Sequence, residues 1–502
     1  MDSLINRVVA GPAPEGHRVT FARLGASESV ELPELRAMAG NVAQGLRRLG
    51  VRPGDRIGIL SANRLEWVLL DLAALRLKVV TAGLEPGKFD PRPELLERYG
   101  LSALFTDQPI SREDGETHKG ILPIEDVRAL AQPSPGDAPL PDVSYDPGEA
   151  TTLKFTSGST GRPKGLAATA GSIDSSLRAV QGMFAHGPGD DIFVFLPLSL
   201  LQQRYWIYSA LCFGHDVTVS TYEAAFAVMP SVRPTVVMGV PGFFETAMRH
   251  VRETGGEPRE LFGDRVRYLW TGSAPARAEM LRFFNEAGVP IYEGYGLNET
   301  CIVTKNHPGA SREGSVGRVV PGKHVVLDED GVIHVRSDHP VARRYEYCAP
   351  GESEAIFLPD GTVRTGDVGH LDEDGFLFVH GRADDAIVLD NGRNVIVRPI
   401  EERMRAEPAI AECVVFCPDQ TRLVAVVSPA GTGADEAAIS ARLAAVNAGL
   451  EPDERISRVI VADPPFSIGN GLLTSQYKPR RQRILDAYRH ELSTRERGIH
   501  AR

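Results

Sequence analysis

The chain has 502 residues, of which 42% are hydrophobic and 24% are charged, so it is large enough for two or more domains. Its formal net charge of −11 argues against nucleic acid or an anionic membrane surface as the main partner. The five cysteines show no CxxC or Cys/His spacing, so neither a zinc site nor a disulfide framework is indicated, and a reducing cytoplasm is expected.

The amino-terminal residues 1–18 lack the charged start and apolar core of a signal peptide. No apolar run approaches the length of a membrane span, so we expect a cytoplasmic protein without one. The first strong element is a predicted helix over residues 31–49, followed by Gly50 as the residue that ends it. Its apolar residues recur at helical spacing: Leu35, Met38, Val42, Leu46 and Leu49.

Strands and helices then alternate along the chain. A helix is predicted near residues 63–77, and short β-branched or apolar runs predict strands. The predicted strands are residues 56–60, 79–82, 102–106, 151–155, 192–196, 217–220, 235–238 and 266–271. This alternation predicts a large α/β domain of several layers with mainly parallel sheets.

The pattern changes after residue 290. Gly331, Gly361 and Gly375 each follow an aspartate, a turn signature between alternating strands, which predicts a β-rich subdomain closing the large domain. A composition shift at residues 381–385 introduces a segment in which short strands mix with helices. We therefore predict a large domain of residues 1–382 and a small α+β domain of residues 383–502.

Hydroxyl residues, glycines and a lysine alternate in residues 156–165, directly after a predicted strand. Glycines can adopt positive φ and bring backbone N–H groups close to an anion, while hydroxyls and a lysine add donors and charge. A solvated turn is the simpler alternative. The ordered Pro-Lys-Gly ending favours a tight phosphate-binding loop, in which the residues expected at positive φ are Gly158, Gly161 and Gly165.

This decapeptide resembles the phosphate-loop signature of the adenylate-forming superfamily, which includes acyl-CoA synthetases, peptide-synthetase adenylation domains and luciferases. The resemblance extends over about residues 32–481. It implies that the large domain binds acyl and nucleotide groups and that Lys164 assists catalysis. It also implies that the phosphates contact Thr156, Ser157, Gly158, Ser159, Thr160 and Gly161.

A second cluster lies at residues 292–300, where a predicted Gly-Tyr-Gly turn could present an aromatic face to a purine and a carboxylate could bind Mg²⁺. The edge of an apolar core is the alternative. The segment resembles the superfamily's Tyr-Gly-x-Thr-Glu motif, which implies that Glu299 binds the metal and acts in catalysis. The implied nucleotide contacts are Gly294, Tyr295, Gly296 and Asn298, with Asn298 in place of the usual Thr.

Two further segments resemble nucleotide-binding motifs of the superfamily. Gly272, Ser273 and Ala274 match its adenine and acyl-pocket turn, with Ser273 in place of the more usual Gly. Residues 364–367 match its ribose motif, in which a carboxylate accepts hydrogen bonds from two ribose hydroxyls. An ordinary turn aspartate is the alternative. The resemblance implies ribose binding by Asp367, nucleotide contact by Arg382 and a hinge at Asp384.

The carboxyl-terminal segments resemble the catalytic parts of the superfamily's small domain. Gly392 matches the loop at the thiol entrance, and Lys478 matches the catalytic lysine of long-chain fatty acyl-CoA synthetases. As bare sequence, Lys478 would be a surface lysine. The resemblance implies that Lys478, Lys164 and Mg²⁺ on Glu299 stabilise the attack of a carboxylate on ATP. It also implies that the small domain then rotates as a mobile lid.

Residues 195–199 also resemble the long-chain branch, but several neighbouring positions depart from it. Leu200 replaces a His, Gln203 a Glu, and Gly242 an Arg. A bulky, polycyclic acid could occupy the space left by Gly242, as in ligases of actinobacterial antibiotic pathways of the platensimycin and platencin type. Core packing is the alternative for the aromatic residues. The predicted acyl pocket comprises Leu200, Tyr205, Trp206, Val240, Gly242 and Phe244.

The resemblance therefore implies an AMP-forming acyl-CoA ligase that uses ATP, Mg²⁺, CoA and a bulky or long-chain carboxylic acid. A second interpretation is an enzyme for one half-reaction, which either receives an acyl-adenylate from an adenylating partner or loads an acyl carrier protein. A third is a non-catalytic nucleotide-binding protein. A homodimer fits each of them, and no nucleic-acid partner is expected.

Overall fold

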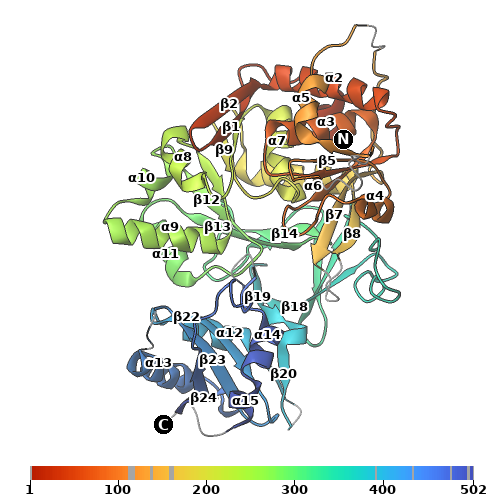
Figure 1. The fold of residues 1–502 in the computed structure, drawn as a ribbon. Helices are drawn as coiled ribbons and strands as arrows, with labels where there is room; N and C mark the ends of the chain where they lie inside the picture. Colours follow the sequence, from red (N-terminus) through yellow and green to blue (C-terminus); the bar gives the residue numbers. More distant parts are fainter. Residues whose placement is uncertain are drawn as a thin grey trace. The chain divides into compact units, whose positions relative to one another are not determined.

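The computed structural model describes residues 3–110, 119–135, 139–157, 163–390, 393–431, 433, 435–474, 478–494 and 498–500 (Figure 1). Its chain forms two compact units. The first comprises Met1–Ala276, Leu281–Val326 and His334–Arg364, and the second comprises Arg277–Met280, Leu327–Ile333 and Thr365–Arg502. The domain boundary at residue 382 stays a prediction.

The first unit is built on two sheets. The larger has the spatial order β15 (Arg318–Val319), β14 (Cys301–Lys305), β13 (Ile291–Leu297), β12 (Tyr268–Thr271), β11 (Val236–Met238), β9 (Asp191–Val194), β10 (Asp216–Val219), β1 (Arg18–Arg23) and β2 (Ala26–Glu31). The smaller has the order β6 (Ile121–Pro123), β5 (Leu101–Thr106), β3 (Arg56–Leu60), β4 (Val80–Leu84), β7 (Ala150–Ser157) and β8 (Pro163–Thr169).

Most neighbouring strands of both sheets run parallel. In the larger sheet the pairs from β13 through to β1 are parallel, and in the smaller sheet only β7 and β8 pair antiparallel. Parallel neighbours need crossover connections, and helices supply them here. The predicted mixed α/β architecture with mainly parallel sheets is thus confirmed.

Helices follow most strands of this unit and bury their apolar residues against the sheets. They are α1 (Leu4–Ala10), α2 (Leu32–Arg48), α3 (Leu65–Leu77), α4 (Pro93–Tyr99), α5 (Val127–Leu130), α6 (Ala170–Phe184), α7 (Leu201–Phe213), α8 (Ala225–Val232), α9 (Pro241–Thr254), α10 (Pro258–Phe262) and α11 (Ala278–Glu286), with a 3₁₀ turn at Ile124–Asp126. The predicted helix at residues 31–49 is α2, which buries Leu35, Val42 and Leu46 on one face.

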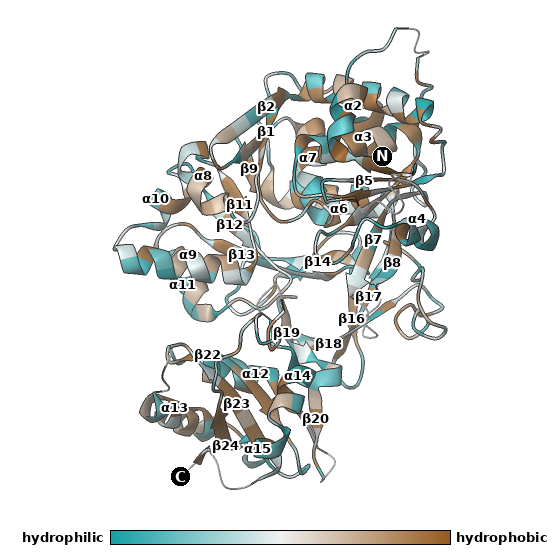
Figure 2. Ribbon diagram, viewed as in Figure 1, coloured by the Kyte–Doolittle hydropathy of each residue, from teal (hydrophilic) through white to brown (hydrophobic). Residues whose placement is uncertain are grey.

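One hydrophobic core joins the two sheets of the first unit. It includes Ile57 and Ile59 of β3 together with Ile192 and Val194 of β9. Helix α3 is buried on nearly every side and appears mostly apolar in Figure 2, as expected of a helix enclosed by other elements. The core therefore holds the carboxyl ends of strands from both sheets in fixed positions.

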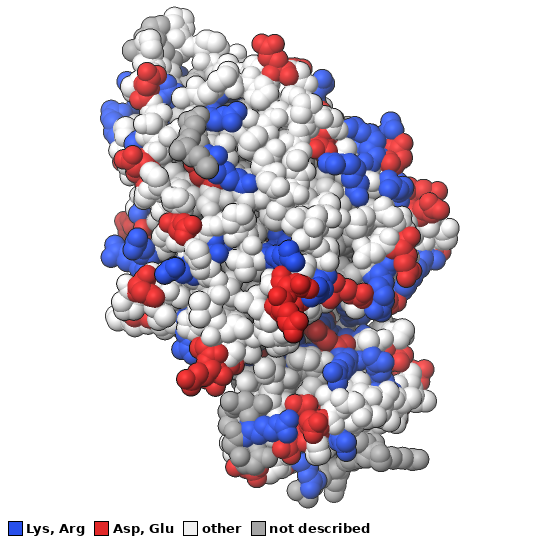
Figure 3. All heavy atoms as spheres, turned by 180° about the vertical axis from the view of Figure 1, so that it is seen from behind, with Lys and Arg blue, Asp and Glu red and all other residues white. Residues whose placement is uncertain are grey.

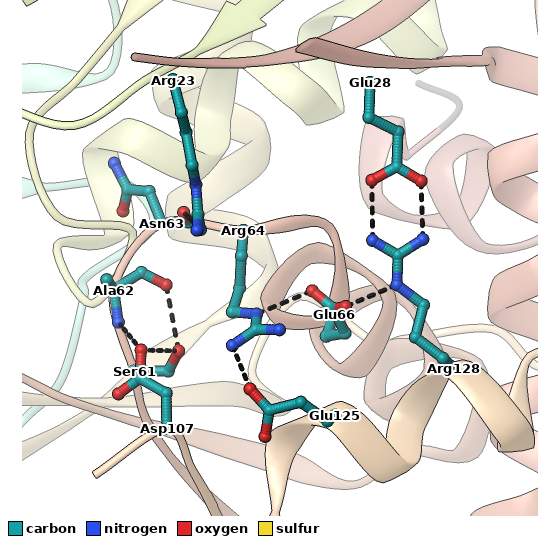
Figure 4. A network of polar contacts seen from close by, with 10 residues as sticks. All are labelled: Arg23, Glu28, Ser61, Ala62, Asn63, Arg64, Glu66, Asp107, Glu125 and Arg128. Atoms are coloured by element: carbon teal, nitrogen blue, oxygen red, sulfur yellow. Dashed lines mark hydrogen bonds and ion pairs between the residues drawn. The ribbon is translucent and has the colours of Figure 1, made fainter. Parts of the chain in front are cut away.

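Asn63, in the turn between β3 and α3, connects the sheets through hydrogen bonds. Its Nδ2 donates to the Leu196 carbonyl at 3.0 Å and to the Ser220 carbonyl at 2.9 Å, while its Oδ1 accepts from the Leu198 N–H at 2.8 Å. Arg23 in turn donates to the Asn63 carbonyl (Figure 4). Because Asn63 is buried, this side chain anchors the segment that leads into α7.

A charged network beside Asn63 holds the first turn of α3. The Glu66 carboxylate accepts hydrogen bonds from Arg64 and Arg128, and Arg128 also pairs with Glu28 (Figure 4). Burial raises the pKa of Glu66, but the hydrogen bonds from Arg64 and Arg128 outweigh it and lower that pKa to about 2. The ionised form is therefore strongly favoured in the folded protein.

We expect Glu66→Gln to lower the free energy of unfolding at pH 7 by up to about 3 kcal/mol. The folded-state pKa lies below the ordinary value of 4.5, so this stabilisation is present above pH 4.5 and is lost as the pH falls toward 2. Urea unfolding of both proteins at several pH values would measure it. A difference in the free energy of unfolding that stays constant from pH 7 to pH 3 would contradict the ion-pair origin. Glu125→Gln, at an exposed end of the network, serves as the control.

The β-rich segment after residue 290 contains β16 (Lys323–Leu327), β17 (Val332–Ser337), β18 (Val363–Leu371) and β19 (Leu377–Arg382), which form a four-stranded sheet in that order. Gly331, Gly361 and Gly375 all have positive φ in the connections before β17, β18 and β19. The predicted Asp-Gly turns and β-rich character are confirmed.

The second unit contains a sheet in the order β22 (Ile410–Phe416), β23 (Leu423–Pro429), β24 (Ile456–Val461) and β25 (Ile499–His500). Both faces are buried, because alternate residues of β22 belong to different cores: Cys413 and Val415 to one, Val414 and Phe416 to the other. The remaining elements are β20 (Ala386–Val388), β21 (Asn394–Ile396), α12 (Arg398–Arg405), α13 (Glu436–Ala448), α14 (Arg481–Ala487), α15 (Arg489–Ser493) and 3₁₀ turns at Ala383–Asp385 and Pro452–Glu454.

Acidic and basic side chains are interspersed on the face seen in Figure 3, and neither sign forms a continuous region there. Within the described residues, no helix combines the length and apolar character required to cross a bilayer.

Candidate nucleotide and acyl site

The predicted phosphate loop lies between two paired strands. β7 and β8 run antiparallel, with Thr156 opposite Lys164 and Ser157 opposite Pro163. Both Thr156 and Lys164 are half-buried strand residues at this end of the hairpin. Four predicted phosphate contacts lie outside the described residues: Gly158, Ser159, Thr160 and Gly161.

The prediction for Gly165 is wrong. Gly165 lies inside β8 and does not have positive φ. A Cβ built there would approach Leu153 Cδ1 to 2.9 Å and Tyr347 Cδ2 to 3.0 Å. Close packing against those side chains therefore explains the glycine, whereas the sequence pattern suggested a loop.

Lys164 and Glu299 both contact one aromatic side chain, Tyr345. The Lys164 ammonium lies 5.1 Å from the centre of the Tyr345 ring and forms an ion pair with Glu352 at 3.1 Å. The Tyr345 hydroxyl donates to Glu299 Oε1 at 2.6 Å. Burial raises the pKa of Tyr345, and the Glu299 carboxylate raises it further, so Tyr345 remains a protonated donor. Sequence reasoning missed Tyr345, because no local signal connects it with Glu299.

The Gly-Tyr-Gly segment is not a turn, which corrects the prediction. It continues β13, and Gly294, Tyr295 and Gly296 pair antiparallel with β14 across a β-bulge. The turn falls at residues 298–300, where Asn298 and Glu299 are half-buried. Tyr295 is also half-buried, so part of its side chain remains exposed on this strand.

Neither glycine of the segment has room for a side chain. A Cβ at Gly294 would approach Lys305 Cδ to 2.7 Å, and one at Gly296 would approach the Cys301 carbonyl oxygen to 2.0 Å. Close approach of β14, rather than positive φ, thus requires glycine at both positions.

We expect Gly296→Ala to abolish detectable nucleotide binding, because the new methyl group forces β13 away from β14 and displaces Glu299. Calorimetric titration with ATP would measure the loss. Gly40→Ala in α2, where a Cβ meets nothing within 4 Å, is the control and should retain normal affinity. Unchanged binding by Gly296→Ala would contradict the placement of the nucleotide on this strand.

The second predicted nucleotide turn follows β12. Ser273 has φ of +67°, a conformation that favours glycine, so the Ser that replaces the family's usual Gly is held in a strained backbone. Gly272 lies beside β13, since a Cβ there would lie 3.1 Å from the Gly294 carbonyl oxygen. Gly272, Ser273 and Ala274 therefore follow the end of β12, which runs parallel to the neighbouring strand β13 that contains Gly294 and Gly296.

The predicted acyl-pocket residues do not form one cluster. Tyr205 and Trp206 of α7 are buried, with Tyr205 Oη 3.4 Å from Cys301 Sγ and Trp206 edge-on to a second tryptophan. Phe244 of α9 packs against a separate group of phenylalanines. Gly242 is exposed, so the structure does not surround it with Tyr205, Trp206 and Phe244. These contacts agree with core packing of the three aromatic residues, and their assignment to an acyl pocket stays a prediction.

Two further predicted pocket residues begin helices. Leu200 is the half-buried residue before α7, and Val240 is the half-buried residue before α9. The segment before α7 lies close to β4, because a Cβ at Gly83 would approach Ser199 Cα to 2.8 Å. Leu200 thus enters α7 from a tightly packed loop, and its role as an acyl contact stays a prediction.

Asp367 and Arg382, the residues predicted to bind the ribose and the nucleotide, are neighbours in the second unit. They face each other across β18 and β19, and Arg382 Nη1 lies 3.3 Å from Asp367 Oδ1 and 2.7 Å from the Thr365 carbonyl oxygen. Gly366 has positive φ, and a Cβ there would meet the Arg382 guanidinium at 2.7 Å. Asp384 is highly exposed and lies 3.5 Å from Arg382. The structure brings these three predicted residues together.

Lys478 is exposed and belongs to the second unit. Its N–H donates to Thr474 Oγ1 at 3.1 Å, and its carbonyl accepts from the Thr474 N–H at 2.8 Å. Although the residue as a whole is exposed, partial burial of its ammonium group lowers the pKa of Lys478, and the charge of Arg398 lowers it further. Gly392, the predicted neighbour of the thiol, lies outside the described residues.

Comparison with known proteins decides the family. The model of the AMP-binding enzyme family matches residues 13–345, and that of the AMP-binding enzyme C-terminal domain matches residues 384–494. The chain belongs to the AMP-binding enzymes. The predicted superfamily is confirmed.

Named relatives of this AMP-binding enzyme are CoA ligases. The long-chain-fatty-acid–CoA ligase FadD15 of Mycobacterium bovis is 31% identical over 443 residues, which cover 74% of this chain and 72% of the relative. The 2-succinylbenzoate–CoA ligase of Bacillus pumilus is 29% identical over 397 residues, 75% of this chain and 78% of the relative. These matches confirm the predicted class, an AMP-forming acid–CoA ligase.

Solved structures share the fold over nearly the whole length. The O-succinylbenzoate CoA synthetase MenE from Bacillus subtilis, in complex with AMP, matches with a TM-score of 0.79 at 22% identity over 96% of this chain and 98% of its own. ATP-bound MatB from Rhodopseudomonas palustris matches with a TM-score of 0.81 at 23% identity over 98% of this chain and 99% of its own.

The residues of this AMP-binding enzyme suit a magnesium–nucleotide complex. Glu299 Oε1 accepts from Tyr345, while no hydrogen bond to Oε2 is formed within the described part of the chain. No cluster of three or more metal-ligating side chains occurs in that part either. Mg²⁺ beside a nucleotide is commonly held by one or two carboxylates together with substrate phosphates, so a single carboxylate fits.

Proposed function

We propose that this AMP-binding enzyme is a complete ligase, which activates a carboxylic acid with ATP and transfers the acyl group to the thiol of CoA. The observation that carries the proposal is the arrangement of Lys164, Tyr345 and Glu299 at the strand ends beside the predicted phosphate loop. It places a cation and a carboxylate around one side chain, as the binding of a metal-bound polyphosphate requires.

In the first step, an oxygen of the acid attacks the α-phosphorus of ATP, and the bond to pyrophosphate breaks. Two anions must approach each other, so cations have to screen their repulsion and stabilise the charge that develops. Lys164 would contact the phosphates after exchanging its ion pair with Glu352, and Lys478 would contact the reacting oxygens. Glu299 would hold Mg²⁺, which when bound withdraws charge from the phosphates.

The nucleoside would be held by residues at the remaining predicted positions. Asp367 would accept hydrogen bonds from the ribose hydroxyls, with Arg382 orienting its carboxylate through a contact of 3.3 Å. Tyr295 and Gly294 of β13, together with Gly272 after β12, would face the adenine.

In the second step, the CoA sulfur attacks the acyl carbonyl and AMP leaves. Lys478 is no longer required in this step, and the exposed Asp384 would serve as the pivot that turns the small domain, with Gly392 beside pantetheine. We propose a bulky or long-chain acid as substrate, since the relatives named above act on a long-chain fatty acid and on 2-succinylbenzoate.

Thioester formation, followed by mass spectrometry, tests this function. A panel of fatty, aryl and polycyclic acids would be supplied with ATP, Mg²⁺ and CoA, and preformed acyl-adenylates with CoA would be tested in parallel. Product from both inputs is expected. Product from the adenylate alone would support a one-step enzyme with an adenylating partner, and product only with a phosphopantetheine carrier protein would support a carrier loader. Nucleotide binding without thioester product from either input would contradict the proposed ligase activity.

A further inference from the structure

Three of the eight lysines of the chain are buried around one segment of the first unit. Lys154 of β7 is 3% exposed, Lys305 of β14 is fully buried, and Lys323 at the start of β16 is 5% exposed. Their ammonium groups do not bind carboxylates in the described structure. Each instead donates to main-chain carbonyl oxygens at the ends of β12 and β13 or in the turn that follows β13.

Two of these lysines hold the residues on either side of Glu299. Lys154 Nζ donates to the Asn298 carbonyl at 2.8 Å, and Lys323 Nζ donates to the Thr300 carbonyl at 2.8 Å. Lys323 also donates to Ser337 Oγ at 2.8 Å, while Lys154 lies 3.7 Å from Cys301 Sγ. The carbonyl groups of Asn298 and Thr300, on either side of Glu299, are therefore each hydrogen-bonded by a lysine from a different strand, β7 or β16.

Burial of these ammonium groups lowers the stability of the folded protein unless their hydrogen bonds compensate for the lost hydration. A buried ammonium group without a carboxylate partner loses its hydration, and burial lowers the pKa of Lys323 for that reason. The clamped turn is also strained, because Cys301 has φ of +54°. An apolar side chain would fill the same space without the loss of hydration, but it would leave the two carbonyls without donors.

The side chain of Glu299 is held separately from its main chain. Tyr345 donates to Oε1 at 2.6 Å, which leaves Oε2 without a hydrogen bond from any described residue. With both neighbouring carbonyls and one carboxylate oxygen restrained, the direction of the other oxygen is set before any ligand arrives. We infer that Lys154 and Lys323 are positioning residues that orient Glu299 toward the metal of the magnesium–ATP complex. This inference rests on the proposed function.

Lys305 provides a matched comparison. It is equally buried and bonds the Tyr292 carbonyl at 2.8 Å and the Thr271 carbonyl at 3.4 Å, with Trp270 3.5 Å below its ammonium group. Its hydrogen bonds thus restrain the opposite end of β13, away from the turn that carries Glu299. Loss of this lysine removes a buried charge as well, but it does not release the carbonyls beside Glu299.

Calorimetric titration of ATP without any acid, in the presence and in the absence of Mg²⁺, tests the inference independently of turnover. The ratio of the two dissociation constants measures how much the metal strengthens ATP binding. We expect Lys154→Met and Lys323→Met each to reduce this ratio by on the order of tenfold, with little change in affinity for ATP alone. Lys305→Met and Lys78→Met, the second of which removes a half-buried lysine paired with Glu149, should leave the ratio unchanged.

Glu299→Gln, measured in parallel, separates this inference from the function on which it rests. If Glu299→Gln keeps the full effect of Mg²⁺, the metal assignment of the proposed function fails. If Glu299→Gln loses the effect while Lys154→Met and Lys323→Met retain it, only the positioning role is overturned. An equal loss of affinity for ATP with and without Mg²⁺ would also overturn the positioning role. Such a loss would show that the two lysines attract ATP only through their positive charge.

A milder variant covers the case in which removal of a buried lysine prevents folding. Ser337→Ala deletes one of the two hydrogen-bond acceptors of Lys323 and keeps its charge. We expect an intermediate reduction of the magnesium effect, of about two- to threefold, because Lys323 loses one of the contacts that fix its position. A ratio identical to that of the unmodified protein would contradict the positioning role of Lys323.

Discussion

Replacing Lys478 with Ala should slow formation of the acyl-adenylate by about 10²- to 10³-fold, as expected for loss of one group that stabilises developing charge. Affinity for ATP should change little, since the nucleotide contacts proposed above come from other residues. Conversion of a preformed acyl-adenylate and CoA to thioester should stay within a few-fold of the normal rate. The reason is that the second step expels AMP and no longer brings two anions together.

Pyrophosphate exchange and single-turnover thioester formation would measure the two steps separately. Lys88→Ala is a suitable control, because Lys88 is exposed and its side chain forms an ion pair with Glu85 three residues away. Equal slowing of both steps by Lys478→Ala would show that the lysine supports the fold or a binding step common to both. A normal rate of pyrophosphate exchange in Lys478→Ala would show that Lys478 takes no part in the first half-reaction.

Arg204→Met should destabilise the first unit by about 3–5 kcal/mol, the usual cost of leaving a buried charge without its partner. Arg204 is 1% exposed, and its Nη1 lies 2.8 Å from Asp71 Oδ1. Its Nη2 donates to Thr152 Oγ1 at 2.9 Å, while Tyr208 also donates to Asp71. These bonds join α7, α3 and β7, so their loss affects the packing of the helix that follows Leu200.

Urea unfolding, followed by tryptophan fluorescence, would report this change, since all three tryptophans belong to the first unit. The double variant Asp71→Leu/Arg204→Met removes both charges and should recover much of the lost stability. Arg233→Met breaks an exposed pair with Asp264 and should leave the unfolding midpoint unchanged. A double variant as unstable as Arg204→Met would show that the guanidinium contributes mainly through its neutral hydrogen-bond partners.

Local patterns in the sequence were sufficient for the overall architecture. The period of the apolar residues in α2 and the short β-branched runs of β9 to β12 depend on neighbours along the chain, so they predict elements correctly. The Asp-Gly pairs before β17, β18 and β19 specify positive φ for the same reason. Short motifs of glycine, hydroxyl and charged residues were likewise sufficient to identify the AMP-binding family, while the roles that they predict for Glu299, Asp367 and Lys478 stay predictions.

Tertiary structure alone decided where several of these side chains lie and what holds them. Lys154, Lys305 and Lys323 look like surface residues in the sequence, because burial of a charge depends on acceptors contributed by distant segments. The Gly-Tyr-Gly segment continues a strand, since β14 returns to pair with it and excludes any Cβ. Tyr345 reaches Glu299 across 46 residues of chain. Contacts of this kind join residues far apart in sequence, so no local pattern encodes them.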